Sequence, residues 1–195
     1  MIARRLAQTL QLGSAEPIQV LGHHAQVSCV IAGEVPDSSL PRPWVFVNGR
    51  ELSKDDVLYS QPGLRSERSL NYLSAVTAIP VIAALLNPDL NVKASLPGVF
   101  GLPGGYPVII REGIVTWDLP GGVTVKDAVA FNQLAARADG IECIGIDGTV
   151  FYTKAARSQM AALCPELAEP LRPSDIVARF DILTRFFKER QPRRG

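Results

Sequence analysis

The stretch YPVIIREGIVTWDLPGGVTVKDAVAFNQLAARADG, residues 106–140, decides the fold class. Tyr106–Ile110 and Ile114–Leu119 are rich in β-branched and aromatic residues and are separated by Arg-Glu-Gly, which predicts a β-hairpin. After Pro-Gly-Gly, Thr124 has the residue type of an N-cap and Asp127 stands three positions later, as in a capping box. Apolar residues then recur at helical spacing. A hairpin followed by an amphipathic helix indicates that strands and helices share one core.

Further elements are expected on both sides of this stretch. Two more hairpins are predicted because Asn-Gly and Asp-Gly supply the positive φ angles of a type I′ turn. Their turns are Asn48-Gly49, between Trp44–Val47 and Arg50–Leu52, and Asp147-Gly148, between Ile141–Ile146 and Thr149–Tyr152. Apolar patterning and cap residues predict the remaining elements. These are helices over Met1–Leu12, from Ser66 or Ser69 to Leu86, from Thr153 to Leu163 and from Ser174 to about Arg190, and strands over Pro17–Leu21 and Gln26–Ala32.

This order of elements predicts an α+β fold, with a mostly antiparallel sheet of hairpins and helices packed on it. The long helix that ends at Leu86 has apolar residues on nearly every face, so we expect it to be buried at the centre of the domain. We expect one mixed domain over residues 1–190, followed by a basic, flexible tail over residues 191–195.

The composition excludes several classes of protein. The chain has 195 residues, 47% of them hydrophobic and 20% charged, with a formal net charge of +1. These proportions are typical of a globular domain and not of a disordered chain, and the charge offers no field to attract nucleic acid. Leu70–Leu86, the most apolar segment, is interrupted by polar residues and Pro80, so no membrane span is predicted. Three distant cysteines without metal-site spacing predict reduced thiols in a cytoplasmic protein.

Leu96–Pro107 is the segment most suggestive of a ligand site, because its twelve residues include three prolines and four glycines. Such a loop is stiff and can present bare main-chain N–H groups to an anionic or planar ligand. We therefore predict ligand contacts at Gly101, Gly104 and Gly105, with Tyr106 stacking on the ligand or donating a hydrogen bond. The segment precedes a strand and not a helix, which excludes dinucleotide and phosphate-loop motifs. The alternative is a rigid crossover with no ligand.

Two other groups of residues are candidates for the same site. His23 or His24 could act as a general base near neutral pH, although an ordinary turn histidine is the alternative. At the start of the long helix, Arg68, Asn71 and Tyr72 could contact an anion together with free N–H groups, or could be a solvated first turn. No metal site is predicted, because two adjacent histidines do not form a first-row metal site by themselves. No cofactor is identified.

These observations lead to two hypotheses for function. The first is a small-molecule-binding enzyme domain, or the substrate-binding and dimerisation part of a metabolic enzyme, with its ligand near the Pro/Gly-rich loop. The alternative is a noncatalytic interaction or accessory subunit, which presents that loop or the Phe180–Phe187 stripe of the last helix to a protein partner. A homodimer is compatible with both hypotheses, since an amphipathic last helix must dock on something.

Overall fold

The computed structural model describes residues 7, 11, 17–53, 55–59 and 67–190, without the side chains of Ile31, Asp56 and residues 67–74. The predicted helix over Met1–Leu12 and the tail over residues 191–195 lie outside the described residues. The chain forms two compact units, Met1–Ala135 and Ala136–Gly195, and each is described by itself. The expectation that residues 1–190 fold as one domain stays a prediction.

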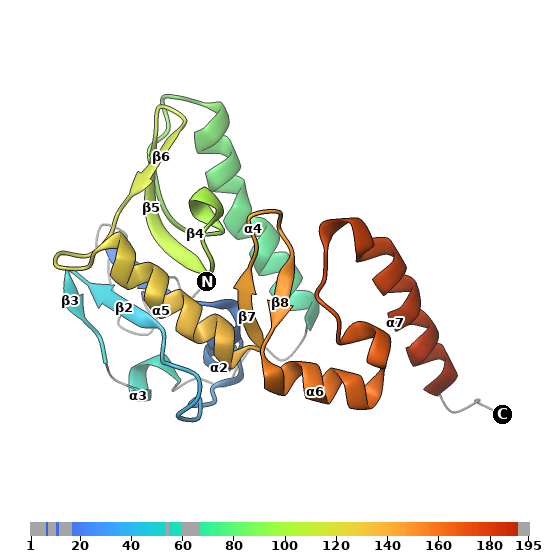
Figure 1. Cartoon of the computed structure of the whole chain (residues 1–195). Helices are drawn as coiled ribbons and strands as arrows, with labels where there is room; N and C mark the ends of the chain where they lie inside the picture. The colour runs from blue at the N-terminus through green and yellow to red at the C-terminus, as the bar shows by residue number, and fades with distance from the viewer. Residues whose placement is uncertain (1–6, 8–10, 12–16, 54, 60–66, 191–195) are drawn as a thin grey trace. The chain divides into compact units, whose positions relative to one another are not determined.

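Helices and antiparallel strands are both present, so the predicted α+β class is confirmed (Figure 1). The strands are β1 (Ile18–Leu21), β2 (Trp44–Val47), β3 (Arg50–Glu51), β4 (Val92–Pro97), β5 (Gly105–Arg111), β6 (Ile114–Trp117), β7 (Ile141–Ile144) and β8 (Val150–Tyr152). The α-helices are α2 (His24–Ala32), α3 (Asp55–Leu58), α4 (Glu67–Leu86), α5 (Val125–Ala138), α6 (Lys154–Leu163) and α7 (Ile176–Arg190). Short 3-10 helices are η1 (Val99–Gly101), η2 (Pro165–Leu167) and η3 (Pro173–Asp175).

The strands form small antiparallel sheets with the orders β1-β2-β3, β4-β5-β6 and β7-β8. The first predicted turn is confirmed, because Asn48 and Gly49 have φ values of 51° and 73° as a type I′ turn requires. The Asp147-Gly148 turn is different, since only Gly148 has a positive φ. There the Asp147 carboxylate accepts hydrogen bonds from the main-chain N–H and the hydroxyl of Thr149, which produces a wider turn between β7 and β8.

The first unit has a core on both faces of its β1-β2 pair. Alternate residues of a strand point to opposite faces, so Val20 of β1 belongs to one cluster and Leu21 to the other. Val20 packs with Val45, Leu58 and other residues contributed by α2 and α3. The second cluster lies between β1, β2, β5 and α5 and contains Leu21, Phe46, Val99, Tyr106, Val108 and Ala128.

The strand predicted over Gln26–Ala32 is wrong, because these residues belong to helix α2. His23 is the N-cap of this helix, and its Nδ1 accepts a hydrogen bond from the N–H of Ala25. The Gln26 side chain in return accepts the N–H of His23 at 2.7 Å. This reciprocal pair is a capping box, which satisfies free N–H groups of the first turn and starts a helix in a β-branched sequence.

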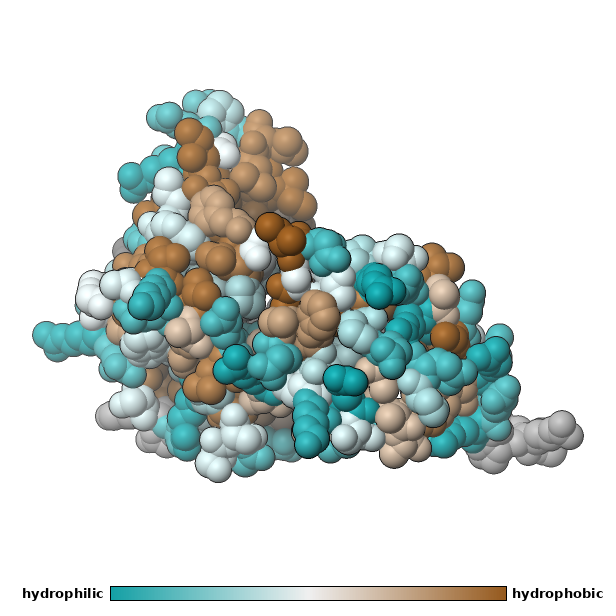
Figure 2. Space-filling model, in the orientation of Figure 1, coloured by the Kyte–Doolittle hydropathy of each residue, from teal (hydrophilic) through white to brown (hydrophobic). Residues whose placement is uncertain are grey.

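Helix α4 has the predicted bounds but not the predicted burial. In its described half, Ala84 is fully buried, whereas Ile79, Ile82, Leu85 and Leu86 are exposed. Apolar side chains accordingly gather on the surface of the region that contains α4 and the β5-β6 hairpin (Figure 2). Helix α4 therefore does not lie at the centre of a core. None of the helices in the described part of the chain is long and apolar enough to cross a membrane.

The second unit consists of the β7-β8 hairpin followed by α6, η2, η3 and α7. Helix α6 begins at the predicted cap, where the Thr153 hydroxyl oxygen accepts the N–H of Ala156. A main-chain bridge joins Val150 of β8 to Leu171. Between residues 136 and 190, the buried residues are the small side chains of Ala136, Thr149, Cys164 and Ala168.

Candidate ligand-binding site

The Pro/Gly-rich segment is the tip of a hairpin and not a crossover from a helix. Its first residues belong to β4, a strand that the sequence analysis missed, and Pro97 pairs with Gly105 at the last rung of the β4-β5 ladder. Besides the bonds of the β4-β5 ladder, four main-chain N–H groups of the segment donate to carbonyl oxygens within the protein. They belong to Gly98, Gly101, Leu102 and Gly105. These N–H groups are used inside the fold, so they do not form an open cradle for an anion.

Phe100 has the most unusual backbone in the loop. Its φ and ψ are 56° and 27°, the left-handed region that a bulky side chain rarely adopts. The side chain nevertheless stays 61% exposed. Its ring contacts the half-buried ring of Trp117 in a T-shaped arrangement, with centroids 4.9 Å apart. The loop therefore holds an aromatic ring at the protein surface at a cost in backbone energy.

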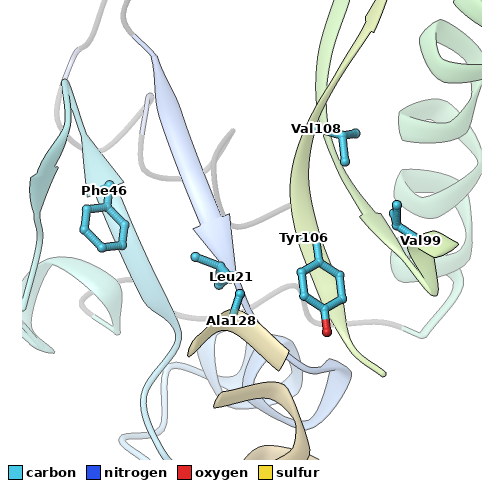
Figure 3. Packing of buried hydrophobic residues seen from close by; sticks show 6 residues of the cluster. All are labelled: Leu21, Phe46, Val99, Tyr106, Val108 and Ala128. Atoms are coloured by element: carbon cyan, nitrogen blue, oxygen red, sulfur yellow. The ribbon is translucent and has the colours of Figure 1, made fainter. Parts of the chain in front are cut away.

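Tyr106 contacts the same Trp117 ring, with centroids 5.5 Å apart, and is fully buried. Figure 3 shows its ring between Leu21 of β1 and Val99 of the loop. The hydroxyl donates a hydrogen bond to the carbonyl oxygen of Pro103 at 2.6 Å, and burial raises the pKa of the phenol. This bond ties the last part of the loop to the start of β5. The predicted role of Tyr106 in catalysis stays a prediction.

A main-chain bridge brings the two histidines to the Pro/Gly-rich loop. The N–H of Gly105 donates to the carbonyl oxygen of Gly22 at 2.8 Å, and the N–H of Gly22 donates back to Gly105. A side chain at position 105 would place its Cβ 2.9 Å from that Gly22 oxygen, so the approach requires glycine. The next residue after Gly22 is His23. Thus two predicted parts of the site, His23 and Gly105, are 82 positions apart in sequence but adjoin in the fold.

Asn132 of α5 is a polar side chain that contacts the loop at Gly105, next to the Gly22–Gly105 bridge. It is fully buried, and its Nδ2 donates to the carbonyl oxygen of Gly105 at 3.1 Å. Its Oδ1 has no hydrogen-bond partner among the described residues. Gly104, with φ of 83°, lies directly beneath this amide, because a Cβ there would be 2.3 Å from the Asn132 Cγ. The glycine is therefore needed for the close packing of α5 on the loop.

The two histidines have different surroundings. His23 is 9% exposed and caps α2, so its Nδ1 acts as an acceptor and its ring orientation is fixed. His24 is exposed at the first position of the helix, with its ring centroid 5.3 Å from that of His23. Of the two, His24 has the greater access to a molecule in solution.

Part of the predicted site lies outside the residues that the structure describes. The side chains of Arg68, Asn71 and Tyr72 lie outside the described residues, so their predicted contacts stay predictions. Gly101 is exposed at the end of η1, and no atom lies within 4 Å of the place where its Cβ would be. The described part of the site thus comprises the loop, the Gly22–Gly105 bridge, the histidines and Asn132.

Two residues of this region were not singled out from the sequence, although each carries a usable signal. Phe100 stands between Gly98 and Gly101, where a large aromatic residue in a turn is expected to be exposed. Asn132 lies four residues after Ala128 and three before Ala135, on the inward stripe of α5. A polar residue on such a stripe indicates a buried hydrogen-bonding role.

Comparisons with known proteins identify no relative: no family model, no curated protein and no solved structure matches this chain.

Proposed function

We propose that the first unit is the small-molecule-binding part of an enzyme, and that its ligand carries a planar ring which contacts Phe100. The observation that supports this proposal is an exposed aromatic side chain on a left-handed backbone.

The energetic argument starts from the cost of the Phe100 conformation. A left-handed backbone costs a residue with a Cβ about 1–2 kcal/mol, which glycine would avoid. The contact with Trp117 returns about 0.5–1.5 kcal/mol beyond the burial of the covered part of the ring, whereas the larger part of the ring stays exposed and adds nothing to stability. Strained conformations that stability does not explain are concentrated at ligand sites. This argument favours a role for Phe100 in binding.

The nature of the ligand follows from what the loop offers. Because the N–H groups of Gly98, Gly101, Leu102 and Gly105 already have main-chain acceptors, recognition of an anion by these groups is disfavoured. The exposed ring of Phe100, supported by Trp117, favours stacking with a flat molecule. A planar ligand therefore fits the loop better than an anionic one.

Catalysis, if the ligand is a substrate, would be assigned to the exposed His24. Histidine is the side chain that most often serves as a general base in enzymes. His23 would keep its place as the cap of α2 and hold the neighbouring backbone. We further propose a cytoplasmic location, since Cys29, Cys143 and Cys164 form no disulfide.

The experiment is a thermal-shift screen of the full chain against ring compounds, such as purines, pyrimidines, flavins, nicotinamides and aromatic amino acids. A ligand that binds the folded state raises the melting temperature. The best compound is then titrated against Phe100→Gly, with Ile114→Ala as a control that removes another exposed apolar side chain of the same unit. We expect about 10-fold weaker binding to the glycine variant, the loss of one stacking contact.

Stability separates this proposal from a structural role of Phe100. Relief of backbone strain partly offsets the loss of the Trp117 contact and of the buried part of the ring, so Phe100→Gly should lower the free energy of unfolding by no more than about 2 kcal/mol and leave the protein folded. Unchanged affinity of the glycine variant for the best compound would refute the proposed contact. A screen in which no ring compound raises the melting temperature would refute the proposed ligand class.

A further inference from the structure

The second unit exposes more large apolar side chains than it buries. Of the described residues 136–190, the buried ones are all small, whereas several isoleucine, leucine, valine and phenylalanine side chains are exposed. A folded unit of about 55 residues needs large buried side chains to offset the conformational entropy that is lost on folding. The exposed apolar side chains of this unit are therefore expected to be buried against a binding partner.

The largest ordered part of that surface is a stripe along α7. Ile176, Phe180, Leu183 and Phe187 are spaced by four, three and four residues, which places them on one face of the helix. With the neighbouring Val177 they are between 39% and 72% exposed. The adjacent face of α7, with Ile182 and Phe186, is half-buried beside η2 and η3. The stripe is thus separate from the side on which α7 rests.

We propose that this α7 stripe binds the α7 stripe of a second copy of the chain, with the two helices antiparallel. An antiparallel pair centred between Asp181 and Ile182 places Ile176 opposite the partner's Phe187 and Phe180 opposite the partner's Leu183. Each pair of facing residues, one from each copy, then combines one phenylalanine with one aliphatic side chain. The successive layers of the interface therefore have similar volumes. A parallel pair would stack phenylalanine on phenylalanine and leave the aliphatic layers underpacked.

The charges at the two ends of the stripe agree with this orientation. In the same register, the last turn of α7, with Lys188 and Arg190, lies beside the N-terminal end of the partner's α7, which directly follows Asp175. Opposite charges therefore lie at the same ends of the pair, without an ion pair across the stripe, and each charge is at the favourable end of its helix dipole. A parallel pair would place the basic last turns, with Lys188 and Arg190, side by side. Charge complementarity thus favours the antiparallel second copy.

The exposed area indicates the strength of the contact. The exposed fractions of the five apolar residues correspond to about three fully exposed side chains, or roughly 500 Å² at 150–200 Å² for each. Two copies together would bury roughly 1,000 Å², the lower limit for a specific interface. We therefore expect a dissociation constant in the micromolar range.

Sedimentation equilibrium of the full chain tests this proposal directly. Between about 1 and 200 µM, the wild-type mass should rise from that of a monomer to that of a dimer. Phe180→Asp should remain a monomer over this range, because it places a charge in the middle of the interface. Ala178→Asp, which adds the same charge on the polar side of α7, should dimerise like the wild type. Far-UV circular dichroism confirms that the variants stay folded, as expected for exposed positions.

The orientation of the helices has its own test by cross-linking. Ile176→Cys and Phe187→Cys are each made in a Cys143→Ser background, which removes the exposed native thiol. An antiparallel pair predicts a disulfide only when the two variants are mixed. Disulfides within each variant alone would overturn the orientation. A wild-type chain that is monomeric at all concentrations, or a dimer that survives Phe180→Asp, would overturn the interface itself.

Discussion

Replacing Gly104 by alanine tests whether the loop and α5 are packed as tightly as the junction requires. A Cβ at this position would lie 2.3 Å from the Asn132 Cγ, 2.5 Å from Oδ1 and 2.6 Å from Cβ. Rotation of the Asn132 side chain would relieve the first two overlaps. The third remains, because the Asn132 Cβ is fixed by the helix backbone. Either the loop or α5 must then move.

The expected cost has two parts. Gly104 has a φ of 83°, and a residue with a Cβ in a left-handed conformation costs about 1–2 kcal/mol. Overpacking of a tight interior adds about 1–3 kcal/mol. Gly101→Ala provides the matched control, because its φ of 74° is similar while no atom lies within 4 Å of its Cβ position. The control should therefore show the backbone cost alone.

Urea unfolding followed by tryptophan fluorescence measures both variants. We expect Gly104→Ala to lower the free energy of unfolding by about 2–5 kcal/mol and Gly101→Ala by about 1–2 kcal/mol. The double variant Gly104→Ala/Asn132→Ala should lose less than the sum of its single changes, since two of the three overlaps disappear. Equal effects of Gly104→Ala and Gly101→Ala would refute the close packing of Asn132 on the loop.

Two further predictions concern the cap of α2 and a buried phenol. His23→Ala should lower the free energy of unfolding by about 1 kcal/mol through loss of the N-cap, whereas His24→Ala should change it by less than about 0.5 kcal/mol; equal losses in urea unfolding would contradict the capping role. Burial raises the pKa of Tyr59 to about 12, from an ordinary value of 10. The unfolded chain therefore loses the Tyr59 proton first, and stability should fall as the pH rises from 10 to 12. Tyr59→Phe should flatten this decline, and parallel profiles of the two proteins would contradict the prediction.

The hairpins were predictable because their signals are local. Asn48-Gly49 fixes its turn through backbone angles that these two residues tolerate, and Arg111-Glu112-Gly113 separates two runs of β-branched residues. The structure has positive φ values at Asn48 and Gly49, and again at Glu112 and Gly113. Thr124 and Asp127 likewise form their predicted capping box within four residues. Each of these features depends only on neighbours in the sequence.

The incorrect prediction of a strand over Gln26–Ala32 has a different cause, because the structure of this segment depends on contacts beyond its own residues. Its valine and isoleucine residues favour β structure, but the cap formed by His23 and Gln26 starts a helix that packs Val30 against β1 and β2. The Gln26 Nε2 also donates to the carbonyl oxygen of Pro41, a contact fixed by the tertiary fold. Tertiary packing here outweighs β propensity, and no local count of residue types reveals it.

The candidate site combines features that depend on neighbouring residues with features that depend on tertiary contacts. The loop could be predicted from the sequence because prolines and glycines are concentrated there. Strand β4 (Val92–Pro97) was not predicted, because its last residue is a proline. The approach of Gly22 to Gly105 depends on a pairing between distant segments, which a single sequence does not encode in any local pattern. The same distinction applies to α7. Its spacing predicts an apolar stripe that must be covered, while the choice of a second copy rests on how phenylalanine, aliphatic and charged residues match when the helix is paired with itself.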